Sequence, residues 1–135
     1  MNTSTSALTE SIFYILLALQ EPMHGYGIMQ KTSAMSRGRL ILSAGTLYGA
    51  ISNLLEKGWI EPGGESSDTD GRRKMYRITD AGQEALKAEL ARLEELVSNG
   101  REFINNAMKT NKTILRWFAD FDKEIPDRFR RGLGE

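Results

Sequence analysis

The sequence predicts a mainly α fold with a small β-hairpin, arranged as a winged helix-turn-helix followed by a C-terminal helical region. Residues 43–57 show the pattern of a capped amphipathic helix, and Gly58 closes it. Two short strand patterns follow at 59–61 and 75–78, separated by a run of turn-forming residues. Beyond residue 80, apolar residues recur at helical spacing. Each of these signals is common by itself, but their succession in this order is specific to a winged helix-turn-helix.

Composition excludes several classes of site. The chain has 135 residues, enough for one domain with an appended interaction element. It has no cysteine and one histidine, which excludes disulfides, thiol catalysis and multi-histidine metal sites. We therefore expect no metal, no cofactor and a cytoplasmic protein. The apolar run 12–19 is far shorter than a membrane span, so no membrane association is expected.

Two helices are expected to come first, after a disordered tail at residues 1–8. Thr9 can cap a helix that ends at Glu21-Pro22, because proline disfavours helical geometry in the residue before it. A second helix is expected from His24 or Gly25 to Ser33 or Ala34. For His24, a capping or packing role is preferred over a general base or effector sensor. The apolar run 40–42 is expected to form a first edge strand.

The third helix is the candidate recognition helix. Ser43 is a strong N-cap. Its buried face is predicted to hold Leu47, Ile51, Leu54 and Leu55. The opposite face then exposes small polar residues, which let a helix lie deep in the major groove; these are Gly45, Thr46, Gly49, Ser52 and Asn53, with Tyr48 at the flank. Without a wing, a plain solvent-facing side would explain this face equally well.

The hairpin after this helix forms the candidate wing. Arg72, Arg73 and Lys74 begin its return strand, where a wing can reach the minor groove or adjacent phosphates. The alternative is a solvated, charged edge strand that blocks aggregation. Trp59 is assigned to the core in preference to a nucleic-acid stacking role.

Charge is partitioned along the chain. The formal net charge is zero, yet residues 22–79 hold eight Lys/Arg against five Asp/Glu, a surplus of three. A local surplus suits a small module that touches a few phosphates. The winged helix-turn-helix is accordingly assigned to residues 9–79.

Residues 80–125 are predicted to form a dimerisation helix or helices, capped by Thr79 or Asp80 and followed by a charged tail at 126–135. Asn99-Gly100 is a helix-stop signal, so a kink or break is expected there. The apolar residues follow a four-three spacing with lapses at Gly100 and Asn111, and such a seam needs a partner helix. They are Leu86, Leu90, Leu93, Val97, Ile104, Ala107, Ile114, Phe118 and Phe121. Of these, Leu86, Leu90, Leu93, Val97, Ile104 and Phe118 are the predicted dimerisation residues.

The chain resembles the PadR family of bacterial transcriptional regulators. The resemblance lies in residues 22–28, 42–48, 54–60, 71–74 and 76–82 and covers roughly residues 8–90. It implies a homodimeric repressor that binds a palindromic operator, dimerises through its C-terminal helices and, in some members, is released by a small, often aromatic ligand. The family usually has proline where this chain has Ala44 and Gly49.

The residues and the resemblance together predict a sequence-specific regulator of double-stranded DNA. The predicted DNA-binding residues are Ser43, Gly45, Thr46, Tyr48, Ser52, Asn53, Arg72, Arg73 and Lys74. A winged-helix module that binds protein instead of DNA is the alternative, and an enzyme is disfavoured because the carboxylates are scattered. An effector pocket is hypothesised at Trp117, Phe118 and Phe121, although the same aromatics would also serve as dimer core.

Overall fold

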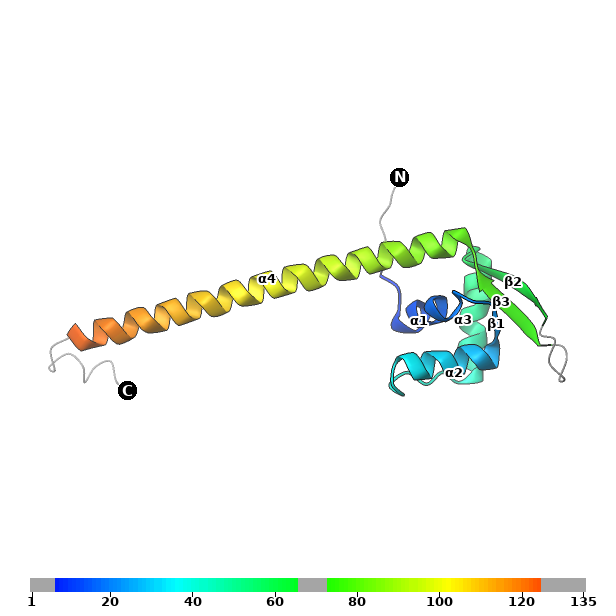
Figure 1. Ribbon diagram of the computed structural model, residues 1–135, viewed down its shortest axis with the longest axis horizontal. Coiled ribbons are helices and arrows are strands. Elements are labelled where there is room, and N and C mark those ends of the chain that lie inside the picture. The colour runs from blue at the N-terminus through cyan, green and yellow to red at the C-terminus, as the bar shows by residue number, and fades with distance from the viewer. Residues whose placement is uncertain (1–6, 66–72, 125–135) are drawn as a thin grey trace. The chain divides into compact units, whose positions relative to one another are not determined.

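The computed structural model describes residues 7–65 and 73–124. Two compact units divide the chain between Arg92 and Leu93. The expected tail 126–135 and most of the expected tail 1–8 lie outside the described residues. Figure 1 shows the first unit as three short helices beside a small sheet, followed by the long helix α4. The predicted mainly α fold with a small β element is confirmed.

Helix α1 spans Glu10–Ala18. Thr9 caps it as predicted, because its hydroxyl accepts a hydrogen bond from the Ile12 amide at 3.2 Å. The helix ends three residues before the predicted Glu21-Pro22 stop. Its buried side chains, with Leu19 just beyond its end, form the centre of the core.

Helix α2 spans Gly25–Met35, and a turn with positive φ at Arg37 and Gly38 follows it. The expected strand at 40–42 is absent from the structure, and that prediction was wrong. The third strand is instead β1, Met23–His24, which pairs antiparallel with β3 and occupies the edge that the 40–42 segment would have needed. Leu42 is buried in the core from an irregular segment, while Ile41 is 77% exposed.

Helix α3 spans Ala44–Lys57, between the predicted caps Ser43 and Gly58. Gly58 has a φ of 75°, the left-handed conformation that favours glycine at a helix end. Leu47, Ile51 and Leu54 are buried as predicted, but Leu55 lies at the edge of the buried face and is 37% exposed.

The sheet has the order β1-β3-β2, with β2 at Ile60–Glu65 and β3 at Lys74–Ile78. The antiparallel register places Ile60 opposite Ile78 and contains an irregularity between Pro62 and Glu65. Trp59 lies half-buried against the core, in agreement with its assignment.

Helix α4 spans Asp80–Glu124. Thr79 precedes it, and its hydroxyl accepts a hydrogen bond from the Gly82 amide at 3.1 Å. The predicted break at Gly100 is wrong, because Gly100 is helical. A glycine inside a helix costs only about 1 kcal/mol relative to alanine, which the many Ala, Leu, Glu, Lys and Arg residues in the rest of α4 offset.

The first turns of α4 belong to the winged-helix unit, which extends to Arg92. Leu86 is 7% exposed and packs in the core of that unit. Its assignment to a dimer seam is therefore wrong, since its side chain is already covered by its own chain. Glu89, 4% exposed, is held by Arg92 through hydrogen bonds of 2.8 and 2.6 Å, which lower the pKa of its carboxyl.

Candidate nucleic-acid interface

The exposed face of α3 is small and polar. Ser43 uses its side chain locally, because its hydroxyl accepts from the Thr46 amide at 3.1 Å and donates to the Thr46 hydroxyl at 3.0 Å. The first turn of the helix is therefore capped, and its predicted contact face is directed away from the core. Every predicted contact residue on and before α3 is exposed; these are Ser43, Gly45, Thr46, Tyr48, Ser52 and Asn53.

The wing contributes Arg73 and Lys74 at the start of β3. Lys74 is exposed and Arg73 is half-buried, with its Nη1 3.4 Å from His24 Nε2. Arg72 lies outside the described residues. At the other end of the same strand, the Arg77 Nε donates to a Glu61 carboxylate oxygen at 2.7 Å, so Arg77 is held on the outer part of the sheet by an ion pair.

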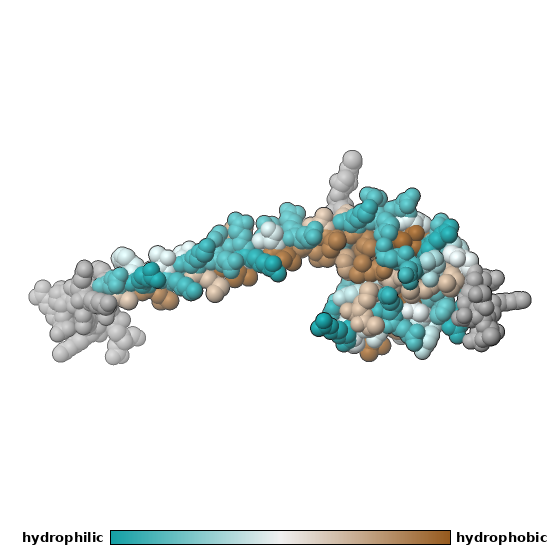
Figure 2. Space-filling view, viewed as in Figure 1, coloured by the Kyte–Doolittle hydropathy of each residue, from teal (hydrophilic) through white to brown (hydrophobic). Residues whose placement is uncertain are grey.

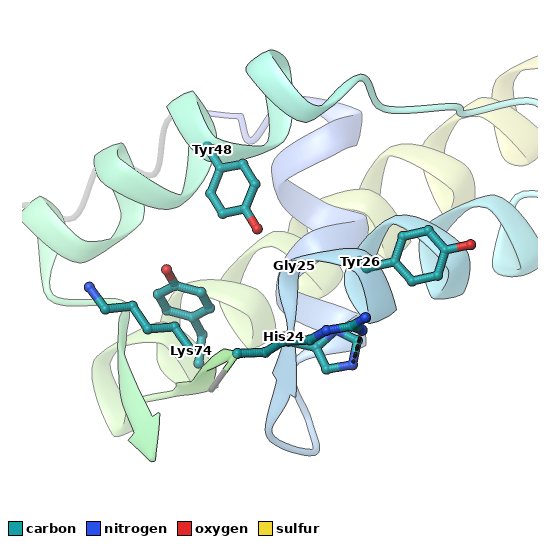
Figure 3. Close-up of a pocket in the computed structure, with 7 residues that line it drawn as sticks. His24, Gly25, Tyr26, Tyr48 and Lys74 are labelled. Atoms are coloured by element: carbon teal, nitrogen blue, oxygen red, sulfur yellow. Dashed lines mark hydrogen bonds between the residues drawn. The ribbon is translucent and has the colours of Figure 1, made fainter. Parts of the chain in front are cut away.

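A cleft of about 690 Å³ joins the two predicted contact regions. Figure 3 shows Tyr48 descending from α3 with its hydroxyl directed toward Gly25, while Lys74 and His24 lie on the other side of the cleft. The lining therefore combines aromatic hydroxyls with cationic groups. Its residues are His24, Gly25, Tyr26, Tyr48, Arg73, Lys74 and Tyr76.

Gly25 is the point where α2 approaches α3. A Cβ at this position would overlap the Tyr48 hydroxyl and lie 2.8 Å from Tyr48 Cζ and 3.3 Å from Leu47 Cδ2. The absence of a side chain thus lets the Tyr48 ring lie over the first turn of α2. Burial raises the pKa of Tyr76, and the neighbouring Tyr48 adds to that shift.

His24 caps α2, which confirms the structural role preferred for it. Its Nδ1 accepts a hydrogen bond from the Gly27 amide at 3.0 Å. Its placement in the cleft together with Tyr76 was missed. The signal would have been strand β1, whose register sets His24 opposite Met75 and Met23 opposite Tyr76, but a two-residue strand has no periodicity to detect.

The distal part of α4 carries the remaining predicted residues. Leu93 is half-buried, and Leu90, Val97, Ile104 and Phe118 are 49–62% exposed. Apolar residues of this helix lie along one side of it in Figure 2, opposite a hydrophilic side.

The hypothesised effector residues also lie on distal α4. The Trp117 and Phe118 rings meet edge to face at 4.9 Å, and both are more than half exposed. The side chain of Phe121 lies outside the described part of the structure.

Within residues 7–65 and 73–124, no group of three or more His, Asp or Glu side chains is arranged to hold a metal ion. None of the described helices is long and apolar enough to cross a membrane.

The family model of the PadR-like transcriptional regulators matches residues 14–88, more than half of the chain. The chain belongs to this family. The matched region runs from α1 into the first turns of α4 and so contains α3, the wing and the cleft between them. The protein is a transcription regulator and not an enzyme.

Similar solved structures support the family assignment and the fold. A PadR-like transcription factor from Bacteroides fragilis is 28% identical, with a TM-score of 0.56 over 69% of this chain and 87% of that one. A putative transcriptional regulator from Thermoplasma acidophilum is 26% identical, with a TM-score of 0.52 over 73% and 90%. A regulator from Clostridium thermocellum, 23% identical with a TM-score of 0.57 over 70% and 91%, supports the fold. No curated protein gave a significant match.

Proposed function

We propose that this PadR-like regulator reads a specific duplex sequence with α3 and holds the flanking phosphates with the wing and Tyr48. The observation that carries the proposal is the exposed face of α3, which holds small polar residues opposite a buried apolar face and adjoins a cleft lined by two cations. Small side chains permit close approach to base edges, and the cations suit phosphate oxygens.

Base contacts are assigned to Ser52 and Asn53, with Thr46 beside them, because their amide and hydroxyl groups are exposed along α3. Phosphate contacts are assigned to Lys74, Arg73 and Tyr48, whose side chains line the cleft. Arg72 joins this second group on the basis of sequence alone. The remaining predicted contacts, Ser43 and Gly45, would bring the helix N-terminus and its backbone amides near the DNA backbone.

The proposed functional unit is a homodimer on a palindromic operator, with half-sites about one helical turn, roughly 34–36 Å, apart. The support is the exposed apolar side of α4, since patches of this kind mark interfaces. Within the proposal, the dimer acts in the cytoplasm as a repressor by occupying promoter DNA. A small aromatic effector would release it by binding at Trp117, Phe118 and Phe121.

Selection of bound sites from a random duplex pool tests the proposal, because it reports binding and the half-site together. Enrichment of a site with dyad symmetry is the expected result. No enrichment of any sequence would overturn the proposal and favour a protein-binding module.

Point variants then separate α3 from the wing. Asn53→Ala should lower affinity unevenly among operator variants, since a base contact discriminates by about 1–3 kcal/mol. Lys74→Ala should weaken all sequences similarly and make the slope of log affinity against log salt shallower by about one unit. Lys87→Ala, an exposed cation on the first turns of α4 and outside the proposed contact residues, is the matched control and should change neither property. An unchanged salt slope for Lys74→Ala would show that the wing does not contact DNA.

A further inference from the structure

The turn between α2 and α3 holds an arginine where the end of a helix favours glycine. The Gly38 amide donates to the Ser33 carbonyl at 2.8 Å. The Arg37 amide donates to the Ala34 carbonyl at 3.1 Å, and together these two hydrogen bonds form a Schellman cap. Arg37 occupies the left-handed position of the cap, with a φ of 56°. Because a Cβ is strained in this conformation, the turn carries its cationic side chain at a cost in stability.

Further hydrogen bonds hold the turn in this shape. The hydroxyl of Ser36, which is 8% exposed, donates to the Ser33 carbonyl at 3.2 Å and accepts from the Leu40 amide at 2.9 Å. The Arg39 amide donates to the Ser36 carbonyl at 3.1 Å. The backbone on both sides of Arg37 is therefore ordered, while the Arg37 side chain itself is exposed.

The charge of Arg37 is available to a ligand. Residues 22–55 hold three basic side chains and no acidic one; the three are Lys31, Arg37 and Arg39. Arg39 forms an ion pair with Glu10 of α1. Among the residues that the structure describes, none forms an ion pair or a side-chain hydrogen bond with the Arg37 guanidinium. An exposed guanidinium with no carboxylate beside it can bind two oxygens of a phosphate.

Helix α2 separates this turn from the cleft. In Figure 1, α2 runs from the sheet to the turn at its far end. Its exposed residues Tyr26, Gln30 and Ala34 recur every four positions and so share one face, which begins in the cleft lining at Tyr26 and leads toward Arg37. Because α2 has 11 residues, its two ends lie about 16 Å apart. The major groove is about 12 Å wide, so the two ends of α2 can reach the phosphates of both strands that border it.

We propose that the Arg37 guanidinium contacts a phosphate of the operator, so that α2 crosses the major groove with a phosphate held at each of its ends. The cleft holds one strand at the start of α2, and Arg37 holds the other strand at the end that lies away from the wing. This inference rests on the DNA binding proposed above and adds a contact to it. It gives the strained backbone of Arg37 a function, since such strain is concentrated at ligand contacts.

Arg37→Gly should change stability and DNA affinity in opposite directions. Glycine relieves the left-handed strain, so the urea midpoint of unfolding should rise by about 0.3–1 M. Loss of one phosphate contact should make the slope of log affinity against log salt shallower by about 0.9 for each protomer bound. Because the effect of counterion release vanishes at 1 M salt, this change weakens binding to a selected operator about 8-fold per protomer at 0.1 M. An arginine with only a structural role would not weaken binding in a more stable protein.

Two variants of the same turn are the controls. Arg37→Lys keeps both the cation and a side chain in the left-handed position, so it should keep the wild-type salt slope and urea midpoint. Arg39→Gln removes the same charge from a guanidinium that already pairs with Glu10, and it should leave the salt slope unchanged. An equal change of slope in Arg37→Gly and Arg39→Gln would overturn the inference, because general charge would then explain both.

Phosphate ethylation interference locates the contact on the selected operator. With the unaltered protein, ethylation of phosphates on both strands that border the groove should block binding. With Arg37→Gly, the phosphates on one border should no longer interfere, while those assigned to the wing still do. An unchanged interference pattern would overturn the inference, and Lys74→Ala and Asn53→Ala would still judge the proposed DNA recognition. Failure to select any duplex sequence would overturn both the inference and the proposed function.

Discussion

The contact between Gly25 and Tyr48 gives a sharp prediction, because one added methyl group should impair DNA binding without unfolding the protein. In Gly25→Ala, the new Cβ would overlap the Tyr48 hydroxyl and lie 2.8 Å from Cζ. Ordinary van der Waals contact begins at about 3.4 Å, so the ring must move by at least about 0.6 Å and the hydroxyl by more. Tyr48 is 49% exposed, so it has room to swing outward.

The cost to binding follows from what the hydroxyl is proposed to do. A displacement of this size takes a hydrogen bond to a phosphate oxygen outside its normal range. A hydrogen bond to a charged group contributes about 1.5–3 kcal/mol, so the dissociation constant should rise by about 10- to 150-fold. Because the clash is with the far end of a flexible side chain, the fold should remain intact.

Fluorescence anisotropy with a selected operator measures the loss, and urea unfolding checks that the fold persists. Gly27→Ala is the matched control on the same helix, because its Cβ would meet its nearest neighbour, His24 Cε1, at an ordinary 3.4 Å. In a Tyr48→Ala background, Gly25→Ala should cost almost nothing further. Equal losses in both backgrounds would refute the idea that Tyr48 transmits the effect, and wild-type affinity of Gly25→Ala would refute the phosphate contact.

Four further substitutions test stability. Gly82→Ala should destabilise the protein by about 1–3 kcal/mol in urea unfolding, because the new Cβ would overlap the backbone carbonyl oxygen of Trp59, which cannot rotate away. Gly49→Ala should instead stabilise the protein by about 0.5–1 kcal/mol, because no atom lies within 4 Å of the new Cβ. Ser43→Ala should cost about 1 kcal/mol by the same measurement through loss of the α3 cap, and an unchanged midpoint would contradict that role. Arg92 lowers the pKa of Glu89, so the ionised carboxylate stabilises the fold above the carboxyl's ordinary pKa of 4.5, and this stabilisation is lost as the pH falls below that value. In Glu89→Gln, the free energy of unfolding should therefore fall less steeply between neutral and acid pH.

The sequence predicted the local features well because each depends on chemistry within one turn of chain. Thr9, Ser43 and Thr79 cap their helices through hydroxyls that meet amides three residues later. Gly58 ends α3 through its own φ. None of these features requires knowledge of distant residues.

Two of the failures, at β1 and at Leu86, concern residues whose neighbours lie far along the chain, and the third, at Gly100, concerns competing local signals. Strand β1 has two residues, and it exists because β3, about 50 positions later, offers a free edge. Leu86 fits the heptad spacing of a dimer seam, yet the winged-helix core covers it. Gly100 carries a local stop signal, but the helix formers around it offset that signal. The local sequence pattern shows that a side chain must pack against a partner, but it does not show which part of the chain, or which other chain, supplies that partner.

The cleft has a consequence for how binding energy is distributed. The first turn of α2 touches α3 through Gly25 and Tyr48, and it touches the wing through His24 and Arg73. Strand β1 pins this same turn to β3. One element therefore sets the spacing between the residues assigned to bases and those assigned to phosphates. A substitution that shifts the start of α2 should alter sequence discrimination and salt slope together, whereas changes within α3 or the wing should alter one of them alone.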